Sequence, residues 1–115
     1  MTAEALAREL VSALDATKAM DIQTLDVRGL TSIADFMIIA SGRSDRQVRA
    51  LAQKALEMAR QLKVKVLGTE GEREGEWILI DLGDVIVHVM HPATRAYYQL
   101  EKLWSGVGRY ASTTP

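Results

Sequence analysis

WILIDLGDVIVHVMH, residues 77–91, is the stretch that decides the fold, because it reads as two β-strands joined by a tight turn. On both sides of Gly83-Asp84 the sequence alternates and is rich in β-branched residues, which is typical of strands. Glycine at the first position of a two-residue loop favours a type II′ hairpin turn. The sequence therefore predicts an antiparallel hairpin, and the position of the turn fixes which residues face one another.

The predicted register sorts the side chains of the hairpin onto two faces with different chemistry. One face is wholly aliphatic and should meet the core, with Leu82 opposite Val85, Ile80 opposite Val87 and Ile78 opposite Val89. The other face is mixed, with Trp77 opposite Met90, Leu79 opposite His88 and Asp81 opposite Ile86. Because a buried Asp or His needs a polar partner, the mixed face is expected to be partly exposed.

Outside the hairpin, hydrophobic periodicity predicts three helices and three further strands. The strands are expected at residues 21–27, 36–41 and 64–68. The helices are expected near residues 3–18, from the N-cap Ser44 to Leu62, and from Pro92 to Trp104. This order predicts a single α/β domain, with a mixed sheet of about five strands and helices packed on it.

The last helix is expected to bury one side and expose the other. We take Leu100 as the centre of the buried side. At about 100° per residue, the residues that share this side are Ala93, Ala96, Tyr97, Leu103 and Trp104. Tyr98 should point almost the opposite way, with Arg95 and Lys102 near it. The domain is expected to cover residues 1–105, followed by a flexible C-terminal tail at 106–115.

The composition excludes several classes of protein. The 115 residues include no cysteine, which excludes disulfides, a cysteine nucleophile and thiolate-bound metals. The formal net charge of −1 gives no global attraction to nucleic acid or to an anionic membrane. Neither a signal peptide nor an apolar run long enough to span a membrane is visible in the sequence. A soluble cytoplasmic protein is therefore expected.

Two acids and both histidines lie in the hairpin stretch, which raises the possibility of a metal or acid–base site. Asp81 and His88 share a face of the predicted hairpin but occupy diagonal positions, while Asp84 lies in the turn. His91 falls on the face opposite His88, next to the start of the last helix. The hairpin therefore separates the four groups, and no metal or cofactor is expected.

SGRSDRQ, residues 41–47, is a second candidate site, because a glycine-containing turn before a helix can hold a phosphate. The complete P-loop and dinucleotide-binding patterns are absent. The alternative that stays open is a small nucleotidyltransferase-like enzyme that binds nucleotide or phosphate through Ser41, Gly42, Arg43 and Asp81. A module whose main activity is RNA binding is a third possibility, although no basic stripe with interleaved aromatic residues is evident.

An apolar and aromatic surface for a protein partner is the remaining candidate. Trp77, Leu79 and Met90 share the mixed face of the hairpin, and Tyr98 lies on the outer side of the last helix. Exposed large residues favour a protein interface, where Trp and Tyr are enriched. The alternative is that a helix covers this face and Trp77 belongs to the core.

Two segments, ADFMIIASGRSDRQVRALA at 34–52 and EWILIDLGDVIVHVMHPATRAYYQLEKLW at 76–104, resemble the Iojap-type ribosomal silencing factor family. In the hairpin the family pattern is carried by Trp77, Leu79, Asp81, Gly83, Asp84, Val85, Val87 and His88. In the last helix it is carried by Arg95, Tyr98, Leu100, Glu101, Leu103 and Trp104. The resemblance covers roughly residues 5–105, and it departs from the pattern at Met90-His91-Pro92.

The resemblance implies a nucleotidyltransferase-like fold without the catalytic carboxylates of true transferases, and therefore a protein that is not an enzyme. It implies docking on ribosomal protein uL14 of the large subunit, which blocks joining of the small subunit. Translation would thereby be repressed when nutrients are limiting. Family members also self-associate, so a homodimer away from the ribosome is expected, whereas a membrane or a specific nucleic-acid sequence is not expected as a partner.

The partner surface that follows from the pairing register and the resemblance combines the hairpin with the last helix. Trp77 and Tyr98 are expected to be the anchors of binding, and Asp81, His88, Arg95 and Glu101 are expected to supply orienting hydrogen bonds or ion pairs. The complete set for uL14 is Trp77, Leu79, Asp81, His88, Met90, Arg95, Tyr98 and Glu101.

Overall fold

A computed structural model describes residues 1–105 of the chain, with side chains described as far as Leu103. The predicted tail at 106–115 and the predicted burial of Trp104 lie outside the described residues. The elements are α1 (Ala3–Ala16), β1 (Met20–Asp26), β2 (Phe36–Ser41), α2 (Asp45–Gln61), β3 (Gly68–Glu70), β4 (Trp77–Asp81), β5 (Val85–Met90), α3 (Pro92–Tyr98) and α4 (Leu100–Ser105).

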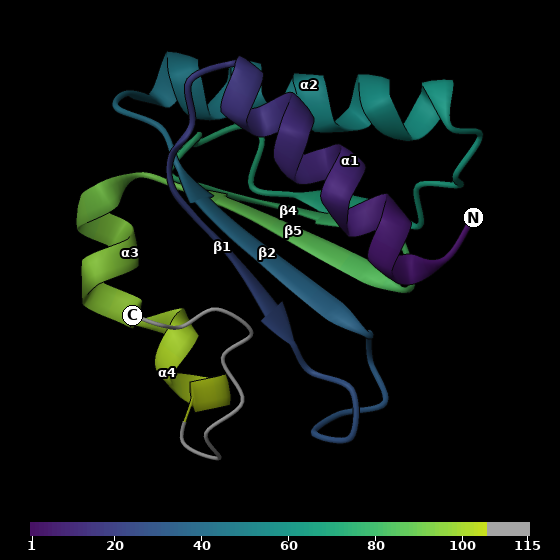
Figure 1. Ribbon diagram of the computed structural model, residues 1–115. Coiled ribbons are helices and arrows are strands. Elements are labelled where there is room, and N and C mark those ends of the chain that lie inside the picture. Colours follow the sequence, from purple (N-terminus) through teal and green to yellow (C-terminus); the bar gives the residue numbers. More distant parts are fainter. Residues whose placement is uncertain (106–115) are drawn as a thin grey trace.

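The five strands form one mixed sheet in the order β1-β2-β5-β4-β3. The two central strands, β2 and β5, run parallel, and every other neighbouring pair is antiparallel. Helices α1 and α2 cover one face of the sheet, whereas α3 and α4 lie on the opposite side (Figure 1). The predicted single α/β domain with a five-stranded mixed sheet is therefore confirmed, while its nucleotidyltransferase-like character stays a prediction.

The hairpin has the register that the sequence predicts. Trp77 pairs with Met90, Leu79 with His88, and Asp81 with Ile86. Gly83 has a φ of +87°, as the first position of a type II′ turn requires. The turn is closed by a 3.0 Å hydrogen bond in which the Leu82 amide donates to the Val85 carbonyl.

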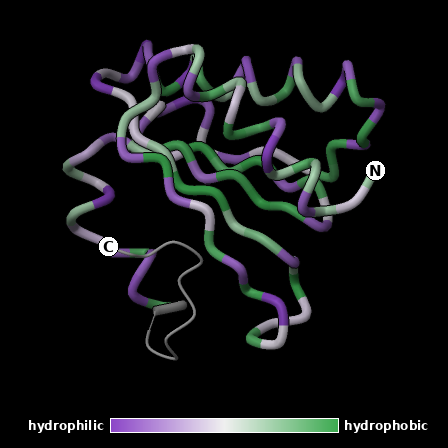
Figure 2. Tube along the Cα trace, in the orientation of Figure 1, coloured by the Kyte–Doolittle hydropathy of each residue, from purple (hydrophilic) through white to green (hydrophobic). Residues whose placement is uncertain are grey.

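The main core lies between the sheet and the helices α1 and α2. The aliphatic face of the hairpin belongs to it, together with the apolar sides of both helices. Helix α2 begins where the sequence predicts, because the Ser44 hydroxyl accepts a hydrogen bond from the Gln47 amide at 3.1 Å. In Figure 2 the central strands are largely hydrophobic, while α2 alternates along its turns, as expected of a helix that covers a sheet.

A second, smaller core lies on the other face of the sheet. Its buried members are Leu25, Val27, Ala34, Met37, Ile39, Ile86 and Met90, and Trp77, Leu79 and Leu100 pack against it. Both faces of β2 and β5 are consequently buried, which agrees with the continuous apolar run of residues 36–41.

The predicted continuous last helix is wrong, because the chain breaks at Gln99. This residue has a left-handed φ of +50° and ends α3, and α4 starts at the next residue with a new direction. A single helical periodicity therefore cannot be extended from Pro92 to Ser105. Against the prediction, Tyr97 and Leu103 are 80% and 68% exposed and Ala93 and Ala96 are exposed as well, whereas Arg95 is buried at 8% exposure.

Two smaller boundaries also differ from the prediction. The strand predicted at 64–68 is found at Gly68–Glu70, where it pairs with β4. The first helix ends at Ala16, so Lys18 lies beyond its last turn with a left-handed φ of +70°. Within residues 1–105, no helix is both long and apolar enough to cross a membrane.

Candidate functional site

Three aromatic side chains, Trp77, Tyr97 and Tyr98, form a continuous cluster at the junction of β4 and α3, which we call the aromatic patch. The ring centroids of Trp77 and Tyr98 are 5.1 Å apart, and those of Tyr97 and Tyr98 are 5.0 Å apart in an edge-to-face arrangement. Tyr98 is 56% exposed and Trp77 is half-buried. The patch therefore presents large amphipathic rings to solvent on a fixed base.

Trp77 is anchored by His88, its diagonal neighbour on the adjacent strand of the hairpin. The indole Nε1 donates a hydrogen bond to His88 Nδ1 at 3.0 Å. Because Nδ1 accepts, the neutral imidazole carries its proton on Nε2. Burial lowers the pKa of His88 to about 4, an effect that the charge of Glu101 partly opposes. His88 is thus a neutral support for the tryptophan at physiological pH.

The predicted exposure of the mixed face is wrong for His88 and Met90. His88 is only 5% exposed, and the polar partner that its burial requires is the indole of Trp77. Met90 is fully buried in the second core, because β5 is a central strand with both faces covered. Neither side chain is exposed enough to form part of a docking surface, so both lie beneath the surface that Trp77 forms.

Leu79 and Asp81 remain partly accessible on the mixed face, beside Trp77 along β4. Leu79 packs against the edge of the second core. Asp81 Oδ1 accepts a 2.9 Å hydrogen bond from the Gly83 amide, which gives the carboxylate a role in holding the turn. The alternation of β4 therefore brings Trp77, Leu79 and Asp81 onto one face in the order that the sequence predicts.

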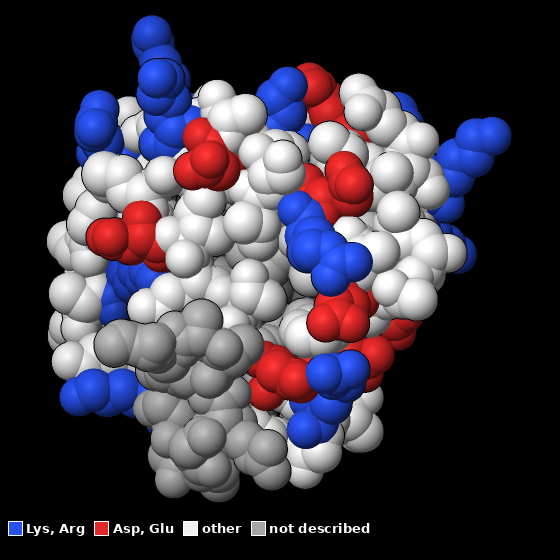
Figure 3. Space-filling model, in the orientation of Figure 1, with Lys and Arg blue, Asp and Glu red and all other residues white. Residues whose placement is uncertain are grey.

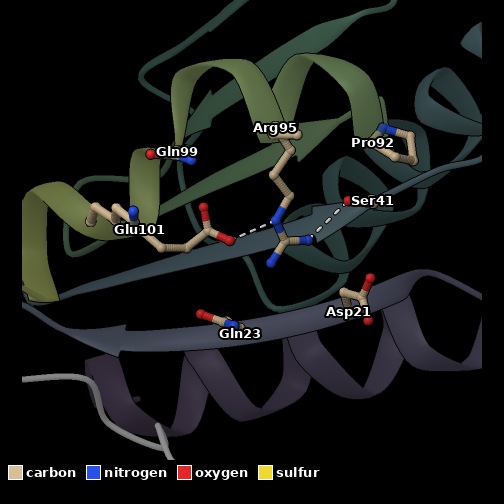
Figure 4. Close-up of a pocket in the computed structure, with 9 residues that line it drawn as sticks. Asp21, Gln23, Ser41, Pro92, Arg95, Gln99 and Glu101 are labelled. Atoms are coloured by element: carbon tan, nitrogen blue, oxygen red, sulfur yellow. Dashed lines mark hydrogen bonds and ion pairs between the residues drawn. The ribbon is translucent and has the colours of Figure 1, made fainter.

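Arg95 and Glu101, predicted as partner contacts, instead pair with each other across the break at Gln99. Arg95 Nε donates to Glu101 Oε2 at 2.7 Å, and Arg95 Nη1 donates to the Ser41 hydroxyl at 2.9 Å (Figure 4). The side chains of Arg95 and Glu101 are 10% and 17% exposed. The ion pair therefore joins α3 and α4 to each other and to the end of β2.

A polar pocket of about 370 Å³ lies beside this ion pair, between β1 and the two short helices. Figure 4 shows Asp21 and Gln23 of β1 on the side of the pocket that faces Arg95. Its charged lining is balanced, with Arg95 and Lys102 against Asp21 and Glu101. This balance gives no net electrostatic attraction for a charged ligand.

The turn at Ser41–Gln47 uses its donors within the protein. The Gly42 amide donates to the Met90 carbonyl, and the Arg43 amide donates to the Gln47 side chain. A Cβ on Gly42 would lie 2.9 Å from the Val48 amide nitrogen, so close packing of the turn on α2 accounts for this glycine. The geometry here is that of a helix start.

The residues of the enzyme alternative do not form one site. Ser41 pairs with Met90 on β5, whereas Asp81 pairs with Ile86, four residues earlier on the same strand. At the usual rise per residue this separates them by about 13 Å along the sheet. The Ser41 hydroxyl also accepts from Arg95. Ser41, Gly42, Arg43 and Asp81 thus do not converge on a common ligand.

The four acids and histidines of the hairpin stretch are likewise separated, as the pairing register predicts. Asp84 lies in the turn, where its carbonyl accepts from the amides of Asp35 and Phe36. His91 is the N-cap of α3, its Nδ1 accepting from the Ala93 amide at 3.3 Å. In the part of the chain that the structure describes, no three metal-ligating side chains gather.

A family model described as "Ribosomal silencing factor during starvation" matches residues 1–114. The chain belongs to the ribosomal silencing factor family. The family that the two motif segments predict is therefore confirmed, and the match extends over almost the whole chain.

Relatives agree with this assignment in both sequence and structure. A ribosomal silencing factor of Chromobacterium violaceum is 44% identical over 106 residues, which is 92% of this chain and 87% of the relative. A crystal structure of a Chromobacterium violaceum protein matches with a TM-score of 0.90 at 42% identity, covering 98% and 95% of the two chains. A mouse protein named "Mitochondrial assembly of ribosomal large subunit protein 1" is 34% identical over 99 residues, and the match covers 43% of its length.

Two members of the site do not follow from the sequence patterns. A single helical periodicity predicts Tyr97 on the buried side of the last helix, whereas the helix ends before Gln99 and Tyr97 is exposed beside Tyr98. The turn pattern predicts Ser41 only as a phosphate ligand, although its hydroxyl accepts from Arg95, 54 residues away. The break at Gln99 has no marker such as glycine, and the contact of Ser41 with Arg95 has no local pattern.

Proposed function

We propose that the chain docks through the aromatic patch on ribosomal protein uL14 of the large subunit and blocks association of the two subunits, which represses translation when nutrients are limiting. Membership of the ribosomal silencing factor family supports the general role. The mouse relative, named for assembly of the ribosomal large subunit, supports that subunit as the partner. The resemblance of the hairpin and last-helix motifs supplies uL14 as the specific target.

The observation that carries the proposal is the exposure of Tyr98 on top of the anchored Trp77. Large aromatic side chains held on a rigid base are suited to act as binding hot spots, because little conformational entropy is lost on docking. The hydrogen bond to His88 fixes Trp77, and the contact at 5.1 Å fixes Tyr98 relative to it. The surface is therefore organised before any partner arrives.

The site residues divide into contacts and supports. Trp77, Leu79, Tyr97 and Tyr98 supply the apolar contact, with Asp81 at its polar edge. His88, Met90, Arg95 and Glu101 lie beneath the surface and hold it in place. This division replaces the sequence-based expectation that all eight predicted residues touch the partner.

A steric mechanism suits the size of the domain, whose Cα trace extends 34 × 33 × 23 Å. A body of this thickness standing on the joining face of the large subunit would occupy space that the small subunit needs. No catalytic step or cofactor is required. We further propose that the protein acts in the cytoplasm and that it forms a homodimer away from the ribosome.

Replacing Tyr98 by alanine tests the docking surface. Binding to purified uL14 should weaken by roughly 2 kcal/mol, or about 30-fold in Kd, because an exposed hot-spot ring is lost. Isothermal titration calorimetry measures the change. Ile33→Ala is the matched control, because Ile33 is 65% exposed in the loop before β2, at the other end of the sheet from Trp77. Equal affinities for the folded Tyr98→Ala variant and the wild type would rule out this surface.

A further inference from the structure

The balanced net charge of the chain conceals a strong regional asymmetry. Residues 43–65, which comprise α2 and its flanking turns, contain seven basic and two acidic residues, a formal charge of +5. The remaining residues contain seven basic and thirteen acidic residues, a formal charge of −6, which restores the overall −1. The positive charge of the protein is therefore concentrated in α2 and its flanking turns.

Six of these basic residues are exposed, three on the outer side of α2 and three in the turns that flank it, and we call them the basic stripe: Arg43, Arg46, Arg49, Arg60, Lys63 and Lys65. Arg46, Arg49 and Arg60 lie within about 60° of one another at 3.6 residues per turn. The rise from Arg46 to Arg60 is about 21 Å. Figure 3 shows Lys and Arg side chains projecting along the upper edge of the molecule, where Figure 1 places α2.

The charges of the basic stripe are available to a ligand. In the described part of the chain, neither Arg46 nor Arg60 forms an ion pair. Arg49 donates to the backbone carbonyls of Glu72 and Arg73, which fix its position without neutralising its charge. Lys54 is excluded from the stripe because its ammonium group lies 3.5 Å from the carboxylate of Glu57.

We propose that the basic stripe binds the phosphate backbone of double-stranded RNA without reading its sequence. Guanidinium groups suit phosphate oxygens because they offer paired donors in a planar fork. The other exposed residues on this side of the helix include Ala50, Gln53, Gln61 and Glu57, whose carboxylate pairs with Lys54, so no aromatic ring is offered for stacking on bases. The same lack of large apolar residues removes the means of inserting into a membrane.

The position of the basic stripe allows it to act together with the aromatic patch. Helix α2 covers one face of the sheet, whereas the aromatic patch lies on the side of α3 (Figure 1). The protein can thus hold a protein partner on one side and an RNA helix on the other. That the RNA belongs to the ribosome rests on the proposed function, whereas RNA binding itself does not.

Fluorescence anisotropy with a labelled RNA duplex of about 20 base pairs tests the basic stripe directly. About four phosphate contacts predict that affinity falls roughly 100-fold between about 50 and about 200 mM salt. Arg46→Gln/Arg60→Gln should weaken binding at the lower salt at least ~10-fold and reduce the slope of log K against log salt by about 2. Both residues are exposed and form no ion pair in the described structure, so the variant should stay folded.

The control is Arg8→Gln/Arg28→Gln, which removes two exposed positive charges outside the basic stripe, that of Arg28 being paired with Asp26 at 2.6 Å. Its affinity for the duplex should stay within about 3-fold of the wild type. Equal losses in the two double variants, or no saturable binding at the lower salt, would overturn the proposal. Binding to anionic phospholipid vesicles but not to the duplex would overturn it as well.

A parallel titration with purified uL14 separates this inference from the proposed function. The Arg46→Gln/Arg60→Gln variant should bind uL14 with unchanged affinity, and Tyr98→Ala should bind the duplex normally. If Tyr98→Ala leaves uL14 binding intact while the basic stripe binds RNA, the proposed function fails and the inference stands. If Tyr98→Ala weakens uL14 binding while the basic stripe does not bind RNA, the inference fails and the proposed function stands.

Discussion

The hydrogen bond from Trp77 to His88 links the exposed aromatic patch to the interior through a single pair of residues. Nδ1 of the imidazole can accept this hydrogen bond only while it carries no proton. Protonation of His88 would place a proton on Nδ1, which could then no longer accept from the indole, and would charge a side chain that is only 5% exposed. The support of Trp77 is therefore sensitive to acid.

The stability of the domain should fall in acid because of His88. Burial lowers its pKa from 6.5 to about 4, so the unfolded chain binds the proton more readily than the folded one. The stabilising effect is complete above about pH 6.5 and is lost as the pH falls through 4. Urea unfolding should show a loss of about 3 kcal/mol between pH 7 and pH 4 attributable to this group.

A His88→Gln variant provides the comparison, since glutamine can accept from the indole and does not titrate. The wild type should lose about 3 kcal/mol more than this variant between pH 7 and pH 4, because the carboxylates that also titrate there are common to both. Parallel stability curves for the two proteins would show that His88 does not titrate as the structure requires.

Single exposed residues of the site were easier to predict than buried charged ones. Trp77 and Tyr98 follow from local periodicity, the first from the hairpin register and the second from its place in the last helix. The burial of Arg95 depends on Ser41, which is 54 residues away, and on Glu101 beyond the helix break. Such long-range partners leave no periodic signal in the sequence around Arg95.

At the scale of secondary-structure elements, the hairpin and the last helix differ in how far local sequence determines them. The type II′ turn and the alternation on both sides fix the register of β4 and β5, so every predicted pair is found. The last helix breaks at Gln99, and the Arg95–Glu101 ion pair spans the break. The arrangement of α3 and α4 thus depends on tertiary contacts.

Replacing Glu101 by glutamine should destabilise the domain more than the same change at an exposed ion pair. The substitution leaves the nearly buried guanidinium of Arg95 without its counter-charge, at a cost of about 2 kcal/mol. Glu57→Gln is the matched control, because Glu57 pairs with Lys54 in solvent and should cost less than about 0.5 kcal/mol. Urea unfolding at pH 7 compares them, and equal costs would contradict the structural role of Glu101.

At the scale of the whole molecule, the sheet order β1-β2-β5-β4-β3 gives the protein two different sides. The central parallel pair joins strands separated by almost half the chain, and this pairing could not be read from local pattern. The alternation of strands and helices did predict the mixed α/β sheet. The same topology places the basic stripe of α2 on one side and the aromatic patch on the other.

We propose that docking of this domain keeps the ribosomal subunits apart. Purified large subunits are incubated with the protein before small subunits are added, and association is followed by light scattering. Saturating wild-type protein and Ile33→Ala should suppress association. Tyr98→Ala at the same concentration should allow an association rate at least ~10-fold higher, because its affinity for uL14 is lower. Complete association in the presence of wild-type protein that has bound the large subunit would contradict the account.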